Sequence, residues 1–391
     1  MQSIRITQPD VLLDRILREA IRLKASDIHL EPQESCLRVR FREDGVLHER
    51  YRQPLKQLEG LSVRAKVLGH MNVAESRKPQ DGSWSAVINK IPYDFRISIL
   101  PSMYGETIVI RILSGEVDFI EKNTLGMLPA QEALFRKALS KKAGMILTCG
   151  PTGSGKTSTL YAALKLLNRE GVSIVSVEDP VEYRISGITQ IQVNELSGLT
   201  FESGLRSIVR QDPDILMIGE IRDKETAEIA VHAALTGHLV LSTLHTNHAA
   251  DAPLRLMDMG IPPYLLSASL SLIMAQRLAG KVCRRCGKER ILLKEEIEML
   301  RLPASLAGAK VREGPGCDAC HEGMAGRTGV FELISIDRRG RDILRNHFSP
   351  DLFREEMKKQ GQLTMGEAAI ELLKAGVIPP SEASLIWAGE E

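Results

Sequence analysis

Residues 150–157 read GPTGSGKT, which is the GxxxxGK[ST] spacing of a loop that wraps the phosphates of a nucleotide. Glycines let backbone N–H groups turn toward an anion, while Lys156 reaches the β and γ phosphates and Thr157 binds Mg²⁺. An apolar run precedes the loop and a helix-forming run follows it, so the strand and helix that this mechanism requires are both expected, which disfavours a chance match. The residues expected at this site are Gly150, Pro151, Thr152, Gly153, Ser154, Gly155, Lys156, Thr157 and Ser158.

Acidic residues follow two further apolar runs. Glu178 and Asp179 come directly after SIVSV, and Glu220 follows ILMIG. Sheets of parallel strands bind ligands at the carboxyl ends of the strands, so these side chains are candidates for holding Mg²⁺ through water and for orienting an attacking water. On pattern alone, each of them can also be a solvated turn residue.

Two histidines, His238 and His245, bracket a fourth apolar run, LVLSTL. An isolated histidine is more often packed or exposed than catalytic, because imidazole serves many roles. The position of this pair, on either side of a core strand in a nucleotide-binding sheet, makes both residues candidates for the site.

Four of the six cysteines form two CxxC pairs, with 30 residues between the pairs. Four thiolates can hold a tetrahedral Zn²⁺ and leave no open position for catalysis, so the predicted site is structural. A redox pair or idle thiols are the alternatives, and His321 could replace one ligand. A short helix is expected between the pairs, at 293–302. The candidate zinc ligands are Cys283, Cys286, Cys317 and Cys320.

Composition narrows the class of protein. The chain has 391 residues, enough for two or three domains, and its net charge of +1 gives no bulk attraction to nucleic acid or anionic lipid. No apolar run reaches the length of a membrane-spanning helix and the first ten residues do not resemble a signal peptide, so we expect a cytosolic protein. Paired cysteines in a reducing compartment favour metal over disulfides.

The spacing of apolar residues predicts an α+β module over residues 1–112. Its expected helices are 10–24, with Asp10 as N-cap, and 61–68. Strands are predicted at 37–41, 93–99 and 107–112, and a turn at 79–82. Arg96 and Arg111 fall on two of these strands, where the sequence alone favours solvated charges on the sheet face.

Residues 113–122 read as a linker, because they carry few apolar anchors. From residue 123 onward, apolar strands alternate with helices, which predicts a mostly parallel sheet flanked by helices. The fold class predicted for the whole chain is therefore α/β, with an α+β module first.

Four segments in this order, GPTGSGKT, SVEDPVEY (176–183), RQDPDILMIGEIRD (210–223) and TGHLVLSTLHTN (236–247), resemble the Walker A, Asp box, Walker B and His box of the secretion ATPases. That family comprises the hexameric motors of type II secretion and type IV pilus assembly. The resemblance extends to SDIHLEP (26–32), KVLGHMNVAESRKPQDG (66–82), GETIVIRIL (105–113) and GRTGVFEL (326–333), so it covers nearly the whole chain.

The resemblance implies a PAS-like N-terminal module and a RecA-like P-loop ATPase domain at 123–391. The second domain would include a zinc lobe at 281–322 and a helical C-terminal part at 338–391. It further implies that Arg96 and Arg111 swing onto the phosphates when the two domains close, and that Arg206 and Arg210 join a polar network at a subunit boundary.

The resemblance also implies the roles of the acidic residues and histidines. Glu178 is the preferred water-activating base with Glu220 on the magnesium side, although these two could exchange roles. Gly219 stands where many P-loop enzymes carry an Asp, so Mg²⁺ would rest on Thr157 and waters. His245, and with it His238, would sense the γ-phosphate.

The function expected from the resemblance is ATP hydrolysis by a homo-hexamer on the cytoplasmic face of an inner membrane. Its partners would be membrane-anchored proteins and an inner-membrane platform protein, with no direct nucleic-acid contact. Type II secretion is preferred over type IV pilus assembly because EDPVEY and the run before GEIRD look closer to that branch, and pilus retraction is disfavoured by the four cysteines.

A DNA-transfer ATPase and a non-hydrolysing nucleotide-dependent scaffold are the alternatives to this motor. Members of the family often carry a further N-terminal domain that docks on a membrane partner, whereas here the motifs begin almost at Met1. We therefore expect either a truncated or a short form.

Overall fold

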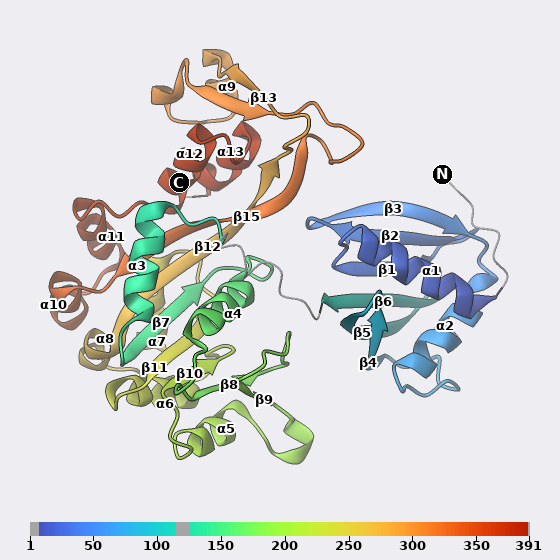
Figure 1. Ribbon diagram of the computed structural model, residues 1–391, viewed down its shortest axis with the longest axis horizontal. Coiled ribbons are helices and arrows are strands. Elements are labelled where there is room, and N and C mark those ends of the chain that lie inside the picture. Colours follow the sequence, from blue (N-terminus) through green and yellow to red (C-terminus); the bar gives the residue numbers. More distant parts are fainter. Residues whose placement is uncertain (1–7, 115–124, 390–391) are drawn as a thin grey trace. The chain divides into compact units, whose positions relative to one another are not determined.

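The computed structural model describes residues 8–114 and 125–389, which fall into two compact units, Met1–Val117 and Asp118–Glu391 (Figure 1). Most of the expected linker, 115–122, lies outside the described residues. Its first two positions, Leu113 and Ser114, belong to the last strand of the first unit. Both units contain sheets and helices, and the predicted α/β class is confirmed.

The first unit is built on a six-stranded sheet in the order β3-β2-β1-β6-β5-β4, with every neighbouring pair antiparallel. Alternate residues of the strands pack with α1 and α2 in one core. The elements are α1 Pro9–Arg22, β1 Asp27–Pro32, β2 Leu37–Glu43, β3 Val46–Gln53, α2 Gln57–Leu68, β4 Gln80–Ile88, β5 Ile91–Ser102 and β6 Gly105–Ser114.

Two local expectations for this unit are wrong. Helix α1 begins at Pro9 with Gln8 as N-cap, so Asp10 lies in the first turn, because proline is favoured at the first helical position. The predicted turn at 79–82 instead begins β4, where Gly82 pairs with Ile97 of β5. A Cβ on Gly82 would lie 2.3 Å from the carbonyl oxygen of Gly69, so this glycine permits a close backbone approach rather than a turn.

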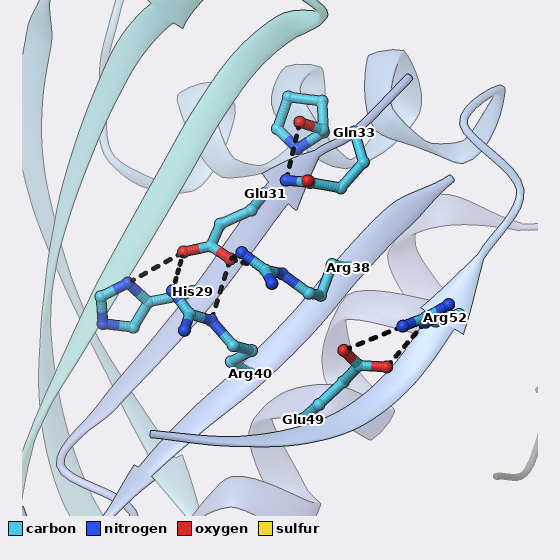
Figure 2. A network of polar contacts seen from close by, with 8 residues as sticks. His29, Glu31, Gln33, Arg38, Arg40, Glu49 and Arg52 are labelled. Atoms are coloured by element: carbon cyan, nitrogen blue, oxygen red, sulfur yellow. Dashed lines mark hydrogen bonds and ion pairs between the residues drawn. The ribbon is translucent and has the colours of Figure 1, made fainter. Parts of the chain in front are cut away.

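Charged side chains occupy the other face of this sheet (Figure 2). The carboxylate of Glu31 on β1 accepts hydrogen bonds from Nε of Arg38 at 3.0 Å and Nε of Arg40 at 2.9 Å. Partial burial works against the charged form, but the hydrogen bonds and charges of these arginines hold the pKa of Glu31 below its usual value. The arginines of β2 are thus fixed by ion pairs within the sheet.

The second unit is built on a seven-stranded sheet in the order β15-β12-β7-β11-β10-β8-β9. All neighbouring pairs are parallel except β12 with β15. The strands are β7 Gly144–Cys149, β8 Ile174–Glu178, β9 Thr189–Gln192, β10 Ile215–Ile218, β11 Leu239–Leu244, β12 Leu270–Val282 and β15 Met324–Ser335.

Helices cover both faces of this sheet, which is why β7, β8, β10 and β11 are buried along their whole length. One core lies between the sheet and α3 and α4, and a second between the sheet and α5 to α8. The helices are α3 Pro129–Leu139, α4 Lys156–Leu167, α5 Phe201–Ile208, α6 Lys224–Leu235, α7 Ala252–Asp258 and α8 Pro263–Ser269.

A small lobe follows β12, and a helical segment ends the chain (Figure 1). The lobe contains β13 Lys288–Ile291, α9 Lys294–Met299 and β14 Lys310–Glu313, and the final helices are α10 Arg338–Asn346, α11 Pro350–Lys359, α12 Met365–Lys374 and α13 Pro380–Ala388. Within the described ranges, no helix has the length and apolar character needed to cross a membrane.

Candidate active site

The phosphate loop runs from the end of β7 at Cys149 to the start of α4 at Lys156, as its spacing predicts. Gly150, Gly153 and Gly155 have φ angles of 143°, 80° and 89°, which favour glycine. A Cβ on Gly150 would lie 2.6 Å from the carbonyl oxygen of Gln276 on β12. The glycines are therefore required both for the turn and for packing against the neighbouring strand.

Two polar side chains of the loop, those of Lys156 and Ser154, are buried. The ammonium group of Lys156 donates to the carbonyl oxygens of Gly150 at 2.7 Å and Pro151 at 3.0 Å, and burial lowers its pKa. The hydroxyl of Ser154 is buried and has no hydrogen-bond partner among the described residues. A buried orphan hydroxyl beside a helix N-terminus fits the binding of a phosphate.

Thr157 and Ser158 lie in the first turn of α4, and the Thr157 side chain is exposed. A threonine hydroxyl at this position can ligate Mg²⁺ that is bound to the phosphates. Gly219 follows β10 and offers no carboxylate there. The residues present therefore fit a magnesium ion held by Thr157, phosphate oxygens and water.

Glu220 lies at the carboxyl edge of the sheet, two residues after β10. Its carboxylate forms a close ion pair with Arg222 and lies 3.2 Å from Nε2 of His245, which directly follows β11. Arg222 also lies 3.7 Å from the carboxylate of Asp179. Three strand ends thus contribute to one polar cluster, and the charge of Glu220 acts on Lys156.

Glu178 has a different environment from Glu220. Its side chain is buried on the α4 side of β8 and accepts hydrogen bonds from the hydroxyl of Tyr161, the hydroxyl of Ser176 at 2.6 Å and the amide of Gln190 at 3.3 Å. Burial raises the pKa of Glu178 despite these donors. Both of its carboxylate oxygens are occupied within the protein.

Tyr161 joins this buried carboxylate to the segment after β8. Its hydroxyl accepts from the backbone N–H groups of Glu182 at 3.1 Å and Tyr183 at 3.3 Å, while it donates to Glu178. Helix α4, which begins at the phosphate loop, is therefore tied through one hydroxyl to the segment 178–183.

His238 is not brought to the site, and its expected contact with the γ-phosphate is corrected. It precedes β11, and its backbone oxygen accepts from Gly144 at the start of β7, whereas His245 follows the other end of the same strand. The ring nitrogen Nδ1 of His238 lies 2.9 Å from the carbonyl oxygen of Ala233. Residues at opposite ends of one strand face opposite edges of a parallel sheet.

The arginines occupy three places. Arg96 and Arg111 are direct cross-strand partners on β5 and β6 of the first unit, and Arg111 pairs with Asp27 at 2.9 Å. Arg206 on α5 is exposed and pairs with Glu202 of the same helix at 2.8 Å. Arg210, just after α5, is exposed and bonds Ser207. Their roles at the phosphates or at a subunit boundary remain predictions.

The four cysteine sulfurs of the lobe all lie within 4.8 Å of one another. The spacing is 3.9 Å between Cys283 and Cys317, 3.6 Å between Cys286 and Cys320, and 3.5 Å between Cys317 and Cys320. Zn–S bonds of about 2.3 Å in a tetrahedron require sulfurs about 3.8 Å apart, so the set fits Zn²⁺. Backbone N–H groups of Cys286 and Arg285 lower the pKa of Cys283 to about 7, which favours a thiolate.

Gln276 is a residue of the site that the sequence reasoning missed. Its side-chain oxygen accepts from the hydroxyl of Thr159 on α4 at 2.7 Å, so it lies under the phosphate loop. The available signal was a polar pair, Gln276 and Arg277, inside the otherwise apolar stretch of β12. Tyr161 and Arg222 were missed as well. The partner of Tyr161, Glu178, is 17 residues away, and Arg222 lies in the segment after β10, where it pairs with Glu220 and Asp179.

Comparison with known proteins shows the family of this chain. The family described as "Type II/IV secretion system protein" matches residues 7–383. The "Type II secretion system protein E" of Pseudomonas aeruginosa is 47% identical over 340 residues, covering 86% of this chain and 67% of that protein. The "Type IV pilus assembly ATPase PilB" of Acinetobacter baylyi is 47% identical over 329 residues, covering 83% of this chain.

The chain spans 57% of the length of that pilus assembly relative and 76% of the "Protein transport protein HofB homolog" of Escherichia coli, to which it is 43% identical. Among solved structures, the pilus retraction motor PilT with bound ADP matches with a TM-score of 0.65 and 26% identity over 94% of this chain and 95% of that one. The Legionella pneumophila ATPase DotB matches over 100% of this chain and 98% of that one, with a TM-score of 0.73 and 21% identity, which bears on the fold alone.

Proposed function

Because this chain belongs to the type II/IV secretion system protein family, we propose that it is the ATP-hydrolysing motor of a filament-assembling machine at an inner membrane. The observation that carries the proposal is the joint position of a complete phosphate loop and the Glu220–His245 pair at one edge of a parallel sheet. Relatives named for type II secretion and for pilus assembly are equally identical, at 47%.

In the proposed reaction, Lys156 and the N-terminus of α4 bind the phosphates and Thr157 supplies a ligand for Mg²⁺. The metal would offset the charge of the phosphates. Glu220 accepts the proton of the attacking water, and His245 orients its carboxylate. A general base needs a carboxylate that can reach water. The Glu220 side chain is partly exposed and its partners Arg222 and His245 are exposed, whereas Glu178 is buried.

Glu178 is assigned a positioning role in this scheme, which reverses the preference that the sequence suggested. The Glu178 carboxylate is buried and bound by three donors from within the protein, so an attacking water has little access to it. It holds the segment 178–183 on α4 instead.

Phosphate release tests this assignment. Glu220→Gln should lower turnover by about 10²- to 10⁴-fold while nucleotide binding persists, since that is the usual contribution of a general base. Glu178→Gln should lower the melting temperature, whereas the folded variant should keep most of its turnover. Near-normal turnover in Glu220→Gln, combined with complete loss in a folded Glu178→Gln protein, would restore the opposite assignment.

The assembly state and the partners are part of the proposal. We take the active form to be a homo-hexamer, with Arg206 and Arg210 at its subunit boundary and Arg96 and Arg111 supplied to the phosphates when the two units close. Type II secretion is the first branch to test and pilus assembly the second. Pull-down from host membranes identifies the membrane-anchored partner, and ATPase stimulation by DNA would instead favour a DNA-transfer motor.

A further inference from the structure

Arg277 of β12 lies beside the phosphate loop and has no role in the scheme above. Strand β12 runs parallel to β7, and Ala275 pairs with Cys149, the last residue before the loop. Residues 276–278 therefore continue along the loop itself. A Cβ on Gly155 would lie 2.8 Å from the amide nitrogen of Gln276 and 3.3 Å from the side chain of Leu278, which shows how closely this part of β12 packs on the loop.

The guanidinium group of Arg277 is half-buried but lacks an acidic partner. Nη2 donates to the side-chain oxygen of Asn247 at 3.3 Å, and Nη1 to the carbonyl oxygen of Gln276 at 3.3 Å. Among residues 8–114 and 125–389, Arg277 forms no ion pair within 4.0 Å, and Glu332 is the carboxylate whose charge acts on it from farther away. Arginine has five N–H donors in a fork that suits two oxygens of one anion, so most of this capacity is unused.

Asn247 belongs to the segment after β11, two residues beyond His245. Its contact with Nη2 therefore holds the arginine against the loop that also carries His245. Arg277 and His245 thus approach the phosphate loop from two neighbouring strands of the sheet, β12 and β11, which flank β7.

Two cations, Arg277 and Lys156, act on one another in this region, and the carboxylates of Glu332 and Glu220 lie near them. Burial lowers the pKa of Arg277, and the nearby charge of Glu332 opposes that effect. Burial also lowers the pKa of Lys156, where the charge of Glu220 opposes this effect and the charge of Arg277 adds to it. Two cations that share a half-buried region are stabilised when an anion enters between them.

We infer that Arg277 binds the terminal phosphate of a nucleoside triphosphate from within the same chain, as a second cation beside Lys156. This inference rests on the proposed ATPase function and deepens it. The fork of Arg277 recognises the oxygens that a diphosphate lacks, and Asn247 is the positioning residue that orients it. The site then distinguishes ATP from ADP before any residue from the first unit or from another subunit arrives.

Calorimetric titration of the full chain with ATP and with ADP tests the inference, with Glu220→Gln as the background so that ATP is not consumed. Adding Arg277→Gln should weaken ATP binding by about 10- to 100-fold, as expected for a charge-assisted contact, and ADP binding by less than about 3-fold. Arg277→Lys keeps the charge without the fork and should be intermediate. Arg345→Gln removes an exposed positive charge from α10 and should change neither affinity.

Equal weakening of ATP and ADP binding, or unchanged ATP binding in both Arg277 variants, would overturn the inference. Asn247→Ala keeps every charge and should reproduce a smaller ATP-specific loss, and its failure to do so removes the positioning role. Failure of the proposed function gives a different result. If the wild-type chain binds ATP more tightly than ADP but releases no phosphate, hydrolysis is refuted while the assignment of Arg277 stands.

Discussion

Removal of one hydroxyl group, in Tyr161→Phe, is expected to destabilise the second unit without creating a cavity. The hydroxyl donates to the buried carboxylate of Glu178 and accepts from the backbone N–H groups of Glu182 and Tyr183. The phenylalanine ring would keep the packing of Tyr161 in the core between α4 and the sheet. The loss is therefore one of hydrogen bonds alone.

The magnitude follows from which groups are left without partners. A buried group that loses its hydrogen-bond partner costs about 1–3 kcal/mol, and more when it is charged. The two N–H groups are only partly buried and can bind water, so they contribute little, whereas the Glu178 oxygen cannot. We expect the free energy of unfolding to fall by about 3 kcal/mol near neutral pH.

The effect should also depend on pH. The pKa of Glu178 is raised by burial, so the stability linked to its protonation is fully present below its unfolded-state pKa and is lost as pH rises through the folded-state value. Loss of the Tyr161 donor raises that folded pKa further. Tyr161→Phe should therefore cost less at about pH 5 than at about pH 8.

Urea unfolding at both pH values measures this prediction, and Tyr183→Phe is the matched control. The Tyr183 ring contacts that of Tyr161 edge-on at 5.5 Å, but its hydroxyl has no hydrogen bond with any residue that the structure describes. The control should change stability by less than about 0.5 kcal/mol. Equal losses in the two variants, or a loss in Tyr161→Phe that is the same at both pH values, would refute the reasoning.

Three further outcomes are expected. Lys156→Ala should abolish phosphate release while the melting temperature stays close to that of the wild type, and persistent turnover would remove Lys156 from the site. Cys283→Ser should lower the zinc content measured by mass spectrometry and the melting temperature, whereas Cys36→Ser, in the first unit, should lower neither. Glu31→Gln should cost about 1 kcal/mol at neutral pH, after allowance for solvent screening. Because the pKa of Glu31 is depressed in the fold, this contribution exists above its unfolded-state pKa and is lost as pH falls through the folded value, so the difference in stability between wild type and variant should shrink as the pH is lowered.

Local spacing was sufficient to predict the phosphate loop, the strand before it and the helix after it. The loop, the strand and the helix each depend on residues that are close together in the sequence. In the loop these are the glycines, which adopt φ angles of 80–143°. The same holds for the clustering of Cys283, Cys286, Cys317 and Cys320, because each CxxC pair is local and only the meeting of the two pairs is not.

Contacts between residues that are far apart in the sequence could not be predicted from local spacing. The hydroxyl of Tyr161 on α4 reaches Glu178 at the end of β8. The spacing of apolar residues predicts the helix and the strand but not which side chains of the two will contact each other. The turn expected at 79–82 failed because pairing with β5 overrides turn chemistry. The misplacement of His238 was avoidable, since two residues that bracket one strand cannot both lie at the same edge of a parallel sheet.

Strand β12 connects the phosphate loop to the cysteine lobe, from Gln276 under the loop to Val282 beside Cys283, with one shift of register against β15 between Gly280 and Val282. At roughly 3.3 Å per residue, the first zinc ligand lies about 23 Å along the strand from Gln276. An insertion or deletion of one residue here would turn the following side chains to the other face of the sheet. Evolutionary changes of length should therefore be confined to the segment between β13 and β14, so that lobes of different size can be carried on a stem of constant length.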